Sequence, residues 1–224
     1  MLPLSADGGK VDFSLYLITD RCALAPGQDL VATVRAALQG GVRAVQLREK
    51  DLGAAELYPL ARELRQLTRE FSARLLINDR IDLALAVAAD GVHLGGHSLP
   101  VAVARRLLGA ERLIGVSTHH PDEVRAAAAA GADFVTLGPV YATPSKLSYG
   151  PPLGLGPLAA ACDAAPLPVF ALGGVTAARL AELSAIGCQH VAVIGAIQQA
   201  IDPQAAAQSL LRTLMATGKK KNSG

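Results

Sequence analysis

The sequence predicts an α/β protein in which eight strand–helix units close into a single-domain (β/α)8 TIM barrel. Short apolar runs alternate with helical stretches, glycines lead into several of these runs, and no linker divides the 224 residues. Alternating strands and helices imply a parallel sheet, and eight units at this length are typical of the closed barrel. An open doubly wound sheet is the alternative, but no stretch resembles the protected edge strand it would need.

The strand–helix units follow one another along the chain. Short apolar runs predict strands at residues 15–19, 44–50, 74–77, 91–94, 113–116, 134–137, 169–172 and 191–194. Apolar residues at helical spacing, or alanine-rich stretches, predict helices at residues 30–38, 54–71, 81–89, 100–108, 121–130, around 156–162, between 176 and 187, and over roughly 203–216. Terminal signals support these helices: Asp29 precedes the first, Pro121 begins the fifth and Thr176 is expected to cap the seventh.

One domain accounts for most of the chain. Residues 15–216 are expected to form the barrel and residues 1–14 an N-terminal extension. Residues 217–224, which include Lys219, Lys220 and Lys221, are expected to form a flexible basic tail. The sequence does not report the oligomeric state, and a homo-oligomer is compatible with it.

The composition argues against several classes of protein. A formal charge of +2 and 4% aromatic residues without Trp do not suggest nucleic-acid binding. No apolar run reaches the roughly 18 residues of a membrane span, and no secretory signal is recognisable. Cys22, Cys162 and Cys188 are widely spaced and show no metal-ligand spacing. We therefore expect a cytoplasmic protein with reduced thiols.

The second predicted strand carries an unusual polar pattern. Gln46, Arg48 and Lys50 alternate with apolar Val45 and Leu47. Because a strand sends alternate side chains to opposite faces, the three polar residues share one face. A solvated edge strand would explain them, but a closed barrel has no edge. We therefore expect them to point into the barrel mouth and bind an anion.

Active sites of TIM barrels lie at the C-terminal ends of the strands. Gly173, Gly174 and Gly195 follow the last two predicted strands, the usual phosphate site of this fold, where glycine lets backbone N–H groups approach an anion. The alternative is that these glycines only permit tight turns. Other polar residues expected at this face are Asp20, Asn78, Asp79, His93, Ser117, His119 and Thr136. Those expected at the opposite, structural face are Arg43, Asp90, Arg112, Asp133 and His190.

A second anion site is expected across the mouth, where Asp79 either holds a Mg²⁺ that bridges phosphate oxygens or only caps a helix. The longest connection, residues 138–154, carries Thr143, Ser145 and Lys146 and is either a phosphate-gripping lid or a solvated loop. The residues predicted for this second site are Arg48, Lys50, Asn78, Ser117, Ser145 and Lys146.

An ordered set of motifs now makes the family recognisable. The motifs are Gln46-x-Arg48-x-Lys50, Ile77-Asn78-Asp79, Gly91-Val92-His93-Leu94-Gly95, Gly115-Val116-Ser117-x-His119, Leu137-Gly138-Pro139-Val140-Tyr141-x-Thr143-x-Ser145-Lys146 and Gly173-Gly174. From about Leu15 to Leu214 the chain resembles the thiamine phosphate synthase/thiazole tautomerase family. Each motif alone is weak, whereas the ordered set is specific.

The resemblance implies a transferase that couples a pyrimidine methyl diphosphate to a thiazole phosphate and releases pyrophosphate. The expected partners are thus two small phosphorylated molecules, and the expected cofactor is Mg²⁺ on Asp79. It implies that Gln46, Arg48, Lys50 and Asn78 hold the pyrimidine diphosphate. Ser117, Ser145 and Lys146 would contact the diphosphate, and Thr143 and Gly173 the thiazole phosphate. The family mechanism is dissociative: pyrophosphate leaves before the thiazole nitrogen attacks.

One departure from the synthase pattern keeps other functions open. Ser98 stands where synthases carry a second Mg²⁺-binding Asp, and a hydroxyl is a poor substitute for a carboxylate. Asp90 does not replace it, because it enters the fourth strand at the opposite end. A tautomerase would need no Mg²⁺ and would use His119 as its acid or base. A non-catalytic binder of thiazole phosphate is a further alternative.

Overall fold

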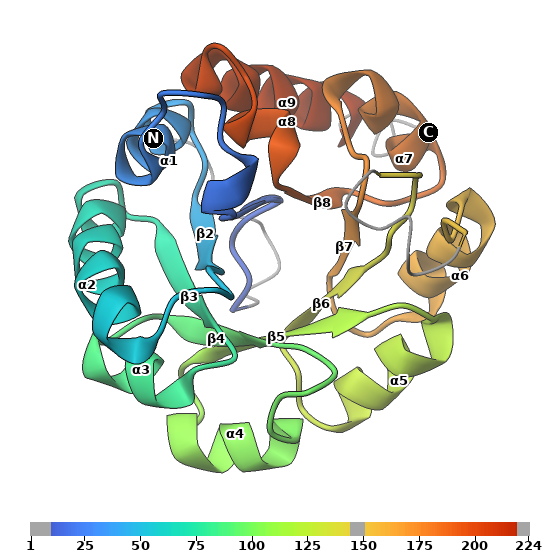
Figure 1. Cartoon of the computed structure of the whole chain (residues 1–224). Coiled ribbons are helices and arrows are strands. Elements are labelled where there is room, and N and C mark those ends of the chain that lie inside the picture. The colour runs from blue at the N-terminus through green and yellow to red at the C-terminus, as the bar shows by residue number, and fades with distance from the viewer. Residues whose placement is uncertain (1–9, 144–150, 219–224) are drawn as a thin grey trace.

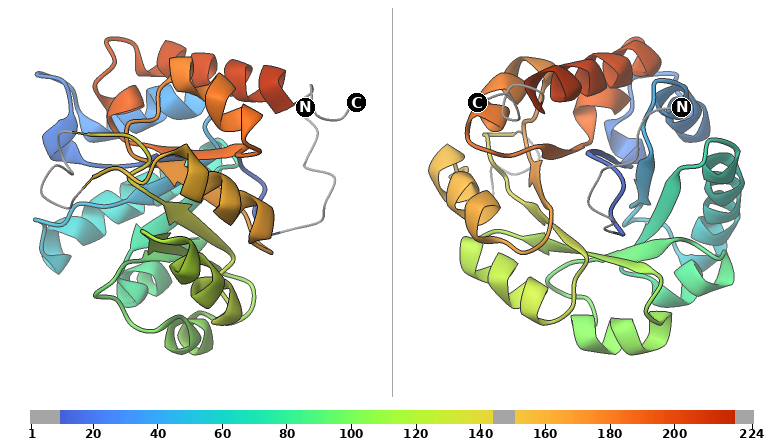
Figure 2. Two further views of the ribbon diagram at one scale, coloured as in Figure 1. Left: turned by 90° about the vertical axis from the view of Figure 1, so that its right-hand side faces the viewer. Right: turned by 180° about the vertical axis from the view of Figure 1, so that it is seen from behind.

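The computed structural model describes residues 10–143 and 151–218. Its eight strands are parallel, pair in sequence order and close into a barrel, because β8 also pairs with β1. Helices ring the barrel on the outside, as the view along its axis in Figure 1 and the two views in Figure 2 show. The closed barrel confirms the predicted (β/α)8 fold and excludes the open doubly wound sheet.

Each strand is followed by helical structure. The strands are β1 (Leu15–Ile18), β2 (Ala44–Leu47), β3 (Arg74–Asn78), β4 (Gly91–Leu94), β5 (Leu113–Thr118), β6 (Phe134–Leu137), β7 (Val169–Leu172) and β8 (His190–Val193). The α-helices are α1 (Leu30–Gln39), α2 (Ala54–Glu70), α3 (Ile81–Ala86), α4 (Val101–Leu108), α5 (Pro121–Ala129), α6 (Leu155–Ala164), α7 (Leu180–Ala185), α8 (Gly195–Gln198) and α9 (Pro203–Gly218). The 3-10 turns are η1 (Arg21–Ala23) and η3 (Ala177–Arg179).

The boundaries of two strands, β2 and β5, differ from the predicted ones by two residues or more. β2 ends at Leu47, because the Arg48 N–H turns to the Thr19 hydroxyl, at 2.9 Å, and no longer extends the ladder. β5 continues to Thr118, whose Cα pairs in register with that of Leu137. Ser117 therefore lies inside a strand instead of following one.

Three helical segments also differ from the expectation. α3 ends at Ala86, because Ala88 takes a left-handed conformation with φ 51°. Thr176 precedes η3 rather than an α-helix, and its side chain makes no capping hydrogen bond. The short helix α8, directly after β8, was not expected as a separate element. All three segments are brief, so hydrophobic periodicity has too few turns in which to show itself.

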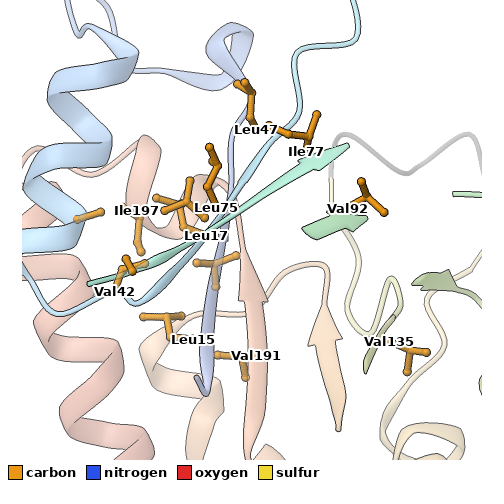
Figure 3. Packing of buried hydrophobic residues seen from close by; sticks show 14 of the residues in the cluster. Leu15, Leu17, Val42, Leu47, Leu75, Ile77, Val92, Val135, Val191 and Ile197 are labelled. Atoms are coloured by element: carbon orange, nitrogen blue, oxygen red, sulfur yellow. The ribbon is translucent and has the colours of Figure 1, made fainter. Parts of the chain in front are cut away.

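Strand alternation divides the apolar residues into two cores. Val45 and Leu47 belong to the larger core between the strands and the helices, and Figure 3 shows Leu47 beside Ile77 in it. Ala44 belongs to the smaller core inside the barrel, and buried Gln46 lines the cavity at its mouth. The predicted parity of this strand is therefore confirmed.

Aromatic rings seal the N-terminal end of the barrel. The Phe13 ring lies 5.3 Å from Phe170, 5.6 Å from Phe134 and 5.7 Å from Tyr16, measured between ring centroids. All four rings are buried, with Tyr16, Phe134 and Phe170 at 0% exposure. Phe13 comes from the predicted N-terminal extension, so at least the end of that segment packs against the barrel.

Ion pairs brace the same end of the barrel. Asp90 pairs with Arg65 at 2.5 Å and accepts the Leu75 N–H at 2.8 Å. Asp133 pairs with Arg105 at 2.6 Å and likewise accepts a strand N–H, that of Ile114. These contacts support the structural role predicted for the two carboxylates. Across residues 10–143 and 151–218, no helix is both long and apolar enough to traverse a bilayer.

Candidate active site

A cavity of about 630 Å³ opens at the C-terminal ends of the strands. It is the place where a TIM barrel carries its active site. Ser145 and Lys146 lie outside the described residues. The predicted site residues that line the cavity are Gln46, Arg48, Lys50, Asn78, Asp79, Ser117, His119, Thr143, Gly173, Gly174 and Gly195.

A cationic wall follows β2. Gln46 is buried, and its amide nitrogen lies 3.5 Å from the Asn78 side-chain oxygen, which links the ends of β2 and β3. Arg48 is half-buried and Lys50 is exposed. Within the described part of the chain, neither cation is engaged in an ion pair. Their charge is therefore available to an anion in the cavity.

Glu49, between the two cations, faces away from the cavity and fixes the turn after β2. One carboxylate oxygen accepts the Thr19 hydroxyl at 2.5 Å, and the other accepts the Arg21 N–H at 2.9 Å. Burial raises the pKa of Glu49, while these hydrogen bonds oppose the rise. The side chain thereby holds the cationic wall against the end of β1. Sequence reasoning missed this role, although strand alternation pointed Glu49 away from the mouth.

Asp79 is the carboxylate predicted to hold Mg²⁺, and it lies at the cavity in an unusual backbone conformation. Its φ is 64°, in the left-handed region, and its N–H donates to the His93 carbonyl at 2.9 Å. Such strain in a residue other than glycine is often found at functional sites. Asp20 also lines the cavity, where its side chain accepts the Cys22 N–H at 3.1 Å.

Ser98 lines the cavity without contributing a carboxylate. Its hydroxyl oxygen accepts the Gly95 N–H at 2.7 Å, so the side chain stabilises its own turn after β4. Among the described residues, no group of three or more His, Cys, Asp or Glu side chains is placed to hold a metal ion. Protein groups alone therefore do not build a complete metal cage in that part of the chain.

His93 lies at the bottom of the cavity and is 2% exposed. Its Nε2 lies 3.1 Å from the Ser117 hydroxyl and 3.4 Å from the Thr136 hydroxyl, and its Nδ1 lies 3.5 Å from the Tyr16 hydroxyl. Burial, and to a lesser extent the charge of Arg48, lowers the pKa of His93 to about 3. We expected this residue at the catalytic face but assigned it no role.

His119 is exposed at the rim of the cavity. Its Nδ1 lies 2.6 Å from the Gly138 carbonyl oxygen, and because a carbonyl only accepts, the hydrogen resides on Nδ1. The backbone N–H of His119 donates to Glu123 at 2.7 Å. The ring is thus held at the rim with Nε2 unprotonated while it is neutral.

The glycines on the opposite wall are required by their surroundings. Gly173 and Gly174 have φ values of 96° and 66°, which side chains rarely tolerate. A Cβ on Gly173 would come within 2.7 Å of Pro139, and one on Gly174 within 2.8 Å of Tyr141. Gly195 begins α8 at the end of β8. The backbone after β7 and β8 is therefore bare of side chains at these three positions of the cavity lining.

A closed parallel barrel with a polar cavity at the C-terminal ends of its strands has the architecture of TIM-barrel enzymes. A family model described as thiamine monophosphate synthase matches residues 15–197. The chain belongs to this family.

The names of similar proteins agree with the family model. The chain is 58% identical over 205 residues to "Putative thiamine-phosphate synthase" of Geobacter sulfurreducens, covering 92% of this chain and 96% of the relative. It is 45% identical over 199 residues to thiamine-phosphate synthase of Syntrophomonas wolfei, covering 89% and 95%. The solved structure of thiamine phosphate pyrophosphorylase from Pyrococcus furiosus superposes with a TM-score of 0.83 at 35% identity, covering 92% of this chain and 96% of that one.

These names bear on the functions left open by the sequence. Each relative reported above is named as a synthase or as a pyrophosphorylase of thiamine phosphate. Neither the tautomerase nor the non-catalytic binder finds support in these comparisons.

The buried His93 predicts a specific loss of stability in acid. Its pKa is about 3 in the folded protein and about 6.5 when unfolded, so between these values the unfolded chain binds a proton that the folded chain does not. The free energy of unfolding should therefore fall by about 1 kcal/mol per pH unit below pH 6.5 because of this residue. The free energy of unfolding, measured with urea at several pH values, should change less steeply with pH for His93→Gln than for the wild type. Replacing exposed His97 by Gln is the control, and equal slopes for wild type and His93→Gln would contradict the prediction.

Proposed function

We infer that this chain is a thiamine-phosphate synthase, a transferase of thiamine biosynthesis. It couples 4-amino-2-methyl-5-(diphosphooxymethyl)pyrimidine to a thiazole phosphate and releases pyrophosphate. The observation that carries this proposal is the cavity itself, in which a cationic wall faces a glycine-rich wall across one mouth. Two anionic substrates need two such walls, and the choice of these two substrates is supported by relatives named as a synthase and a pyrophosphorylase of thiamine phosphate.

The cationic wall suits the pyrimidine diphosphate. Arg48 supplies a planar, permanently charged fork, which is the geometry best matched to phosphate oxygens. Lys50 adds a mobile point charge at the rim. The amides of Gln46 and Asn78 lie deeper, within 3.5 Å of each other, and offer hydrogen bonds to polar atoms of the pyrimidine. We assign these four residues and Ser117 to this substrate.

The glycine wall suits the thiazole phosphate. Gly173, Gly174 and Gly195 expose backbone at the ends of β7 and β8, so N–H groups can approach phosphate oxygens closely. Thr143, which also lines the cavity, adds a hydroxyl on this side. This arrangement holds the thiazole nitrogen across the cavity from the diphosphate, where it can meet the pyrimidine methylene carbon.

The reaction needs charge stabilisation rather than a protein nucleophile. When the bond between the methylene carbon and the diphosphate oxygen breaks, its electrons leave with pyrophosphate and a pyrimidine-methyl cation remains. Arg48, Lys50 and the Ser117 hydroxyl stabilise the departing anion. The thiazole nitrogen then gives its lone pair to the carbon. Lys146 and Ser145 are proposed, from the sequence resemblance alone, as further contacts of the leaving group. None of these reaction steps requires a proton transfer by His119.

The residues at the mouth fit a Mg²⁺ ion that takes most of its ligands from the phosphate oxygens of the substrate. Asp79 offers a carboxylate and Asn78 an amide oxygen, the hard oxygen donors that Mg²⁺ prefers. Ser98 adds no charge, since its hydroxyl accepts the Gly95 N–H. Mg²⁺ commonly binds through one or two carboxylates together with substrate phosphates, which is the arrangement available here. When bound, the ion would neutralise charge on the leaving pyrophosphate.

Two further expectations are kept as proposals. A cytoplasmic location is supported by Cys22 and Cys188, whose thiols form no disulfide within the described residues. A homo-oligomer remains a prediction that measuring the mass in solution would decide.

The proposed function is tested directly by supplying both substrates. The purified chain should form thiamine phosphate and pyrophosphate in equal amounts, and only when Mg²⁺ is present. Both products are followed in one assay, the first by fluorescence after oxidation and the second by a coupled phosphate release. Absence of thiamine phosphate at high enzyme and Mg²⁺ concentration would exclude the synthase. Isomerisation of a thiazole phosphate carboxylate by the same preparation would instead restore the tautomerase.

Arg48 and Arg43 provide a matched pair at opposite ends of one strand. Replacing Arg48 by Gln should lower kcat/KM for the pyrimidine diphosphate about 100-fold, because a charge-assisted contact to the leaving group is lost. Arg43→Gln should leave kcat/KM nearly unchanged, because Arg43 is exposed at the opposite end and donates to the Leu38 and Val42 carbonyls. Similar losses in the two variants would show that β2 does not carry the diphosphate site.

Ser98 predicts how the enzyme depends on Mg²⁺. Ser98→Asp adds a second carboxylate to the cavity that Asp79 lines and should lower the Mg²⁺ concentration for half-maximal rate about tenfold. Ser98→Asn has a similar shape without the charge and should show no such decrease. The measurement is the initial rate against Mg²⁺ concentration at saturating substrates. Equal Mg²⁺ dependence of the two variants would mean that position 98 lies too far from the ion to matter.

A further inference from the structure

A chain of three hydrogen-bonding side chains runs upward from the barrel interior to the cavity. Tyr16 on β1, His93 on β4 and Ser117 on β5 follow one another with distances of 3.5 Å and 3.1 Å between their polar atoms. Tyr16 and His93 are buried, whereas Ser117 lines the cavity. These three side chains therefore connect the barrel interior to Ser117, the residue that the proposed function places on the diphosphate.

Burial decides the direction of the first hydrogen bond. Tyr16 is 0% exposed, and His93 Nδ1 is the partner of its hydroxyl within the described structure. A buried O–H that lacks an acceptor is costly, so Tyr16 donates and Nδ1 accepts. A neutral imidazole carries one hydrogen, which must then reside on Nε2. The phenol thereby selects the Nε2–H tautomer of His93.

The second hydrogen bond follows from the first. With its hydrogen on Nε2, His93 donates to the Ser117 oxygen, the nearer of two hydroxyls at that nitrogen. Ser117 then uses an oxygen lone pair for His93, and its own hydrogen remains available to the cavity. The opposite tautomer would make His93 an acceptor that draws this hydrogen away from the substrate.

Packing holds the ring where this geometry requires it. The His93 ring lies 5.7 Å from Tyr16 and 5.7 Å from Phe134, between centroids. Gly115 leaves just enough room, because a Cβ there would come within 2.6 Å of His93 Nδ1 and 2.4 Å of the Phe134 ring. The imidazole is therefore confined on several sides.

We propose that His93 is a positioning residue, set in its Nε2–H tautomer by Tyr16, that turns the Ser117 hydroxyl into a hydrogen-bond donor for the leaving diphosphate. The inference rests on the proposed function for the identity of the anion. The part of the proposal that concerns the tautomer of His93 does not depend on any substrate. The same donor would stabilise pyrophosphate as negative charge develops on the bridging oxygen.

His190 provides the matched control for a buried histidine. It lies at the other end of the barrel, with its ring 5.0 Å from Phe170, and burial lowers its pKa as well. The structure gives its ring no hydrogen bond to a cavity residue among the described side chains. Loss of His190 should therefore affect packing without affecting Ser117.

The tautomer is measured first, on the wild-type protein without substrate. With ¹⁵N-labelled histidine, His93 should show a protonated shift at Nε2 and an unprotonated shift at Nδ1, assigned by comparison with His93→Gln. Tyr16→Phe should produce a mixture of both tautomers. A hydrogen found on Nδ1 in the wild type overturns the proposal, whatever the enzyme catalyses.

Kinetics then test whether His93 acts through Ser117. In an enzyme shown to make thiamine phosphate, Tyr16→Phe should lower kcat about 3- to 10-fold while KM for the thiazole phosphate stays constant. His93→Leu should lower kcat further, and His93→Gln should recover part of the loss, because its amide can donate to Ser117. In a Ser117→Ala background, Tyr16→Phe should have no further effect.

The control variant His190→Gln should keep the wild-type kcat in both backgrounds. An equal effect of Tyr16→Phe in the wild-type and in the Ser117→Ala background would show that Tyr16 and His93 serve packing alone. Thermal unfolding of every variant separates a loss of folded protein from a loss of turnover. A wild-type chain that makes no thiamine phosphate would refute the proposed function but would leave the tautomer result standing.

Discussion

Closure of the barrel is the constraint on which the rest of this structure depends. Each strand pairs with a neighbour along both edges, so the sheet has no free edge, and its two faces look into the barrel and toward the surrounding helices. Alternate side chains must enter either the shell beneath the helices or the narrow interior. At the catalytic end the interior positions cease to be core and become cavity wall. The same alternation that buries Ala44 therefore delivers Gln46 to the wall of the cavity.

The narrow interior also explains where glycine is found. Gly91 and Gly138 leave no room for a Cβ, because Leu113 and Leu172 carbonyl oxygens would lie 2.1 Å and 2.0 Å from it. Gly115 makes space for an imidazole in the same way. Small residues thus let the polar side chains and the aromatic rings share one confined volume. Substituting them would disturb the site through packing rather than through chemistry.

Sequence patterns predicted the fold and most of the cavity lining, because both follow from local periodicity and from the rule that strand ends gather at one face. The roles of Glu49 and His93 were missed for a common reason. Each depends on partners far away in the sequence, Thr19 for Glu49 and both Tyr16 and Ser117 for His93. Strand alternation says which way a side chain points but not what it meets. The end of β2 was misplaced for the same reason, since the Thr19 hydroxyl takes the N–H that would have continued the ladder.

The aromatic plug beneath the cavity has a kinetic consequence. Phe13, Phe134 and Phe170 fill the far end of the barrel, and the cavity opens at the C-terminal ends of the strands. Substrates and products must therefore enter and leave through the same opening. A product that lingers therefore obstructs the arrival of both substrates, even if it resembles only one of them. Release of product through this opening therefore has to precede each new round of substrate binding.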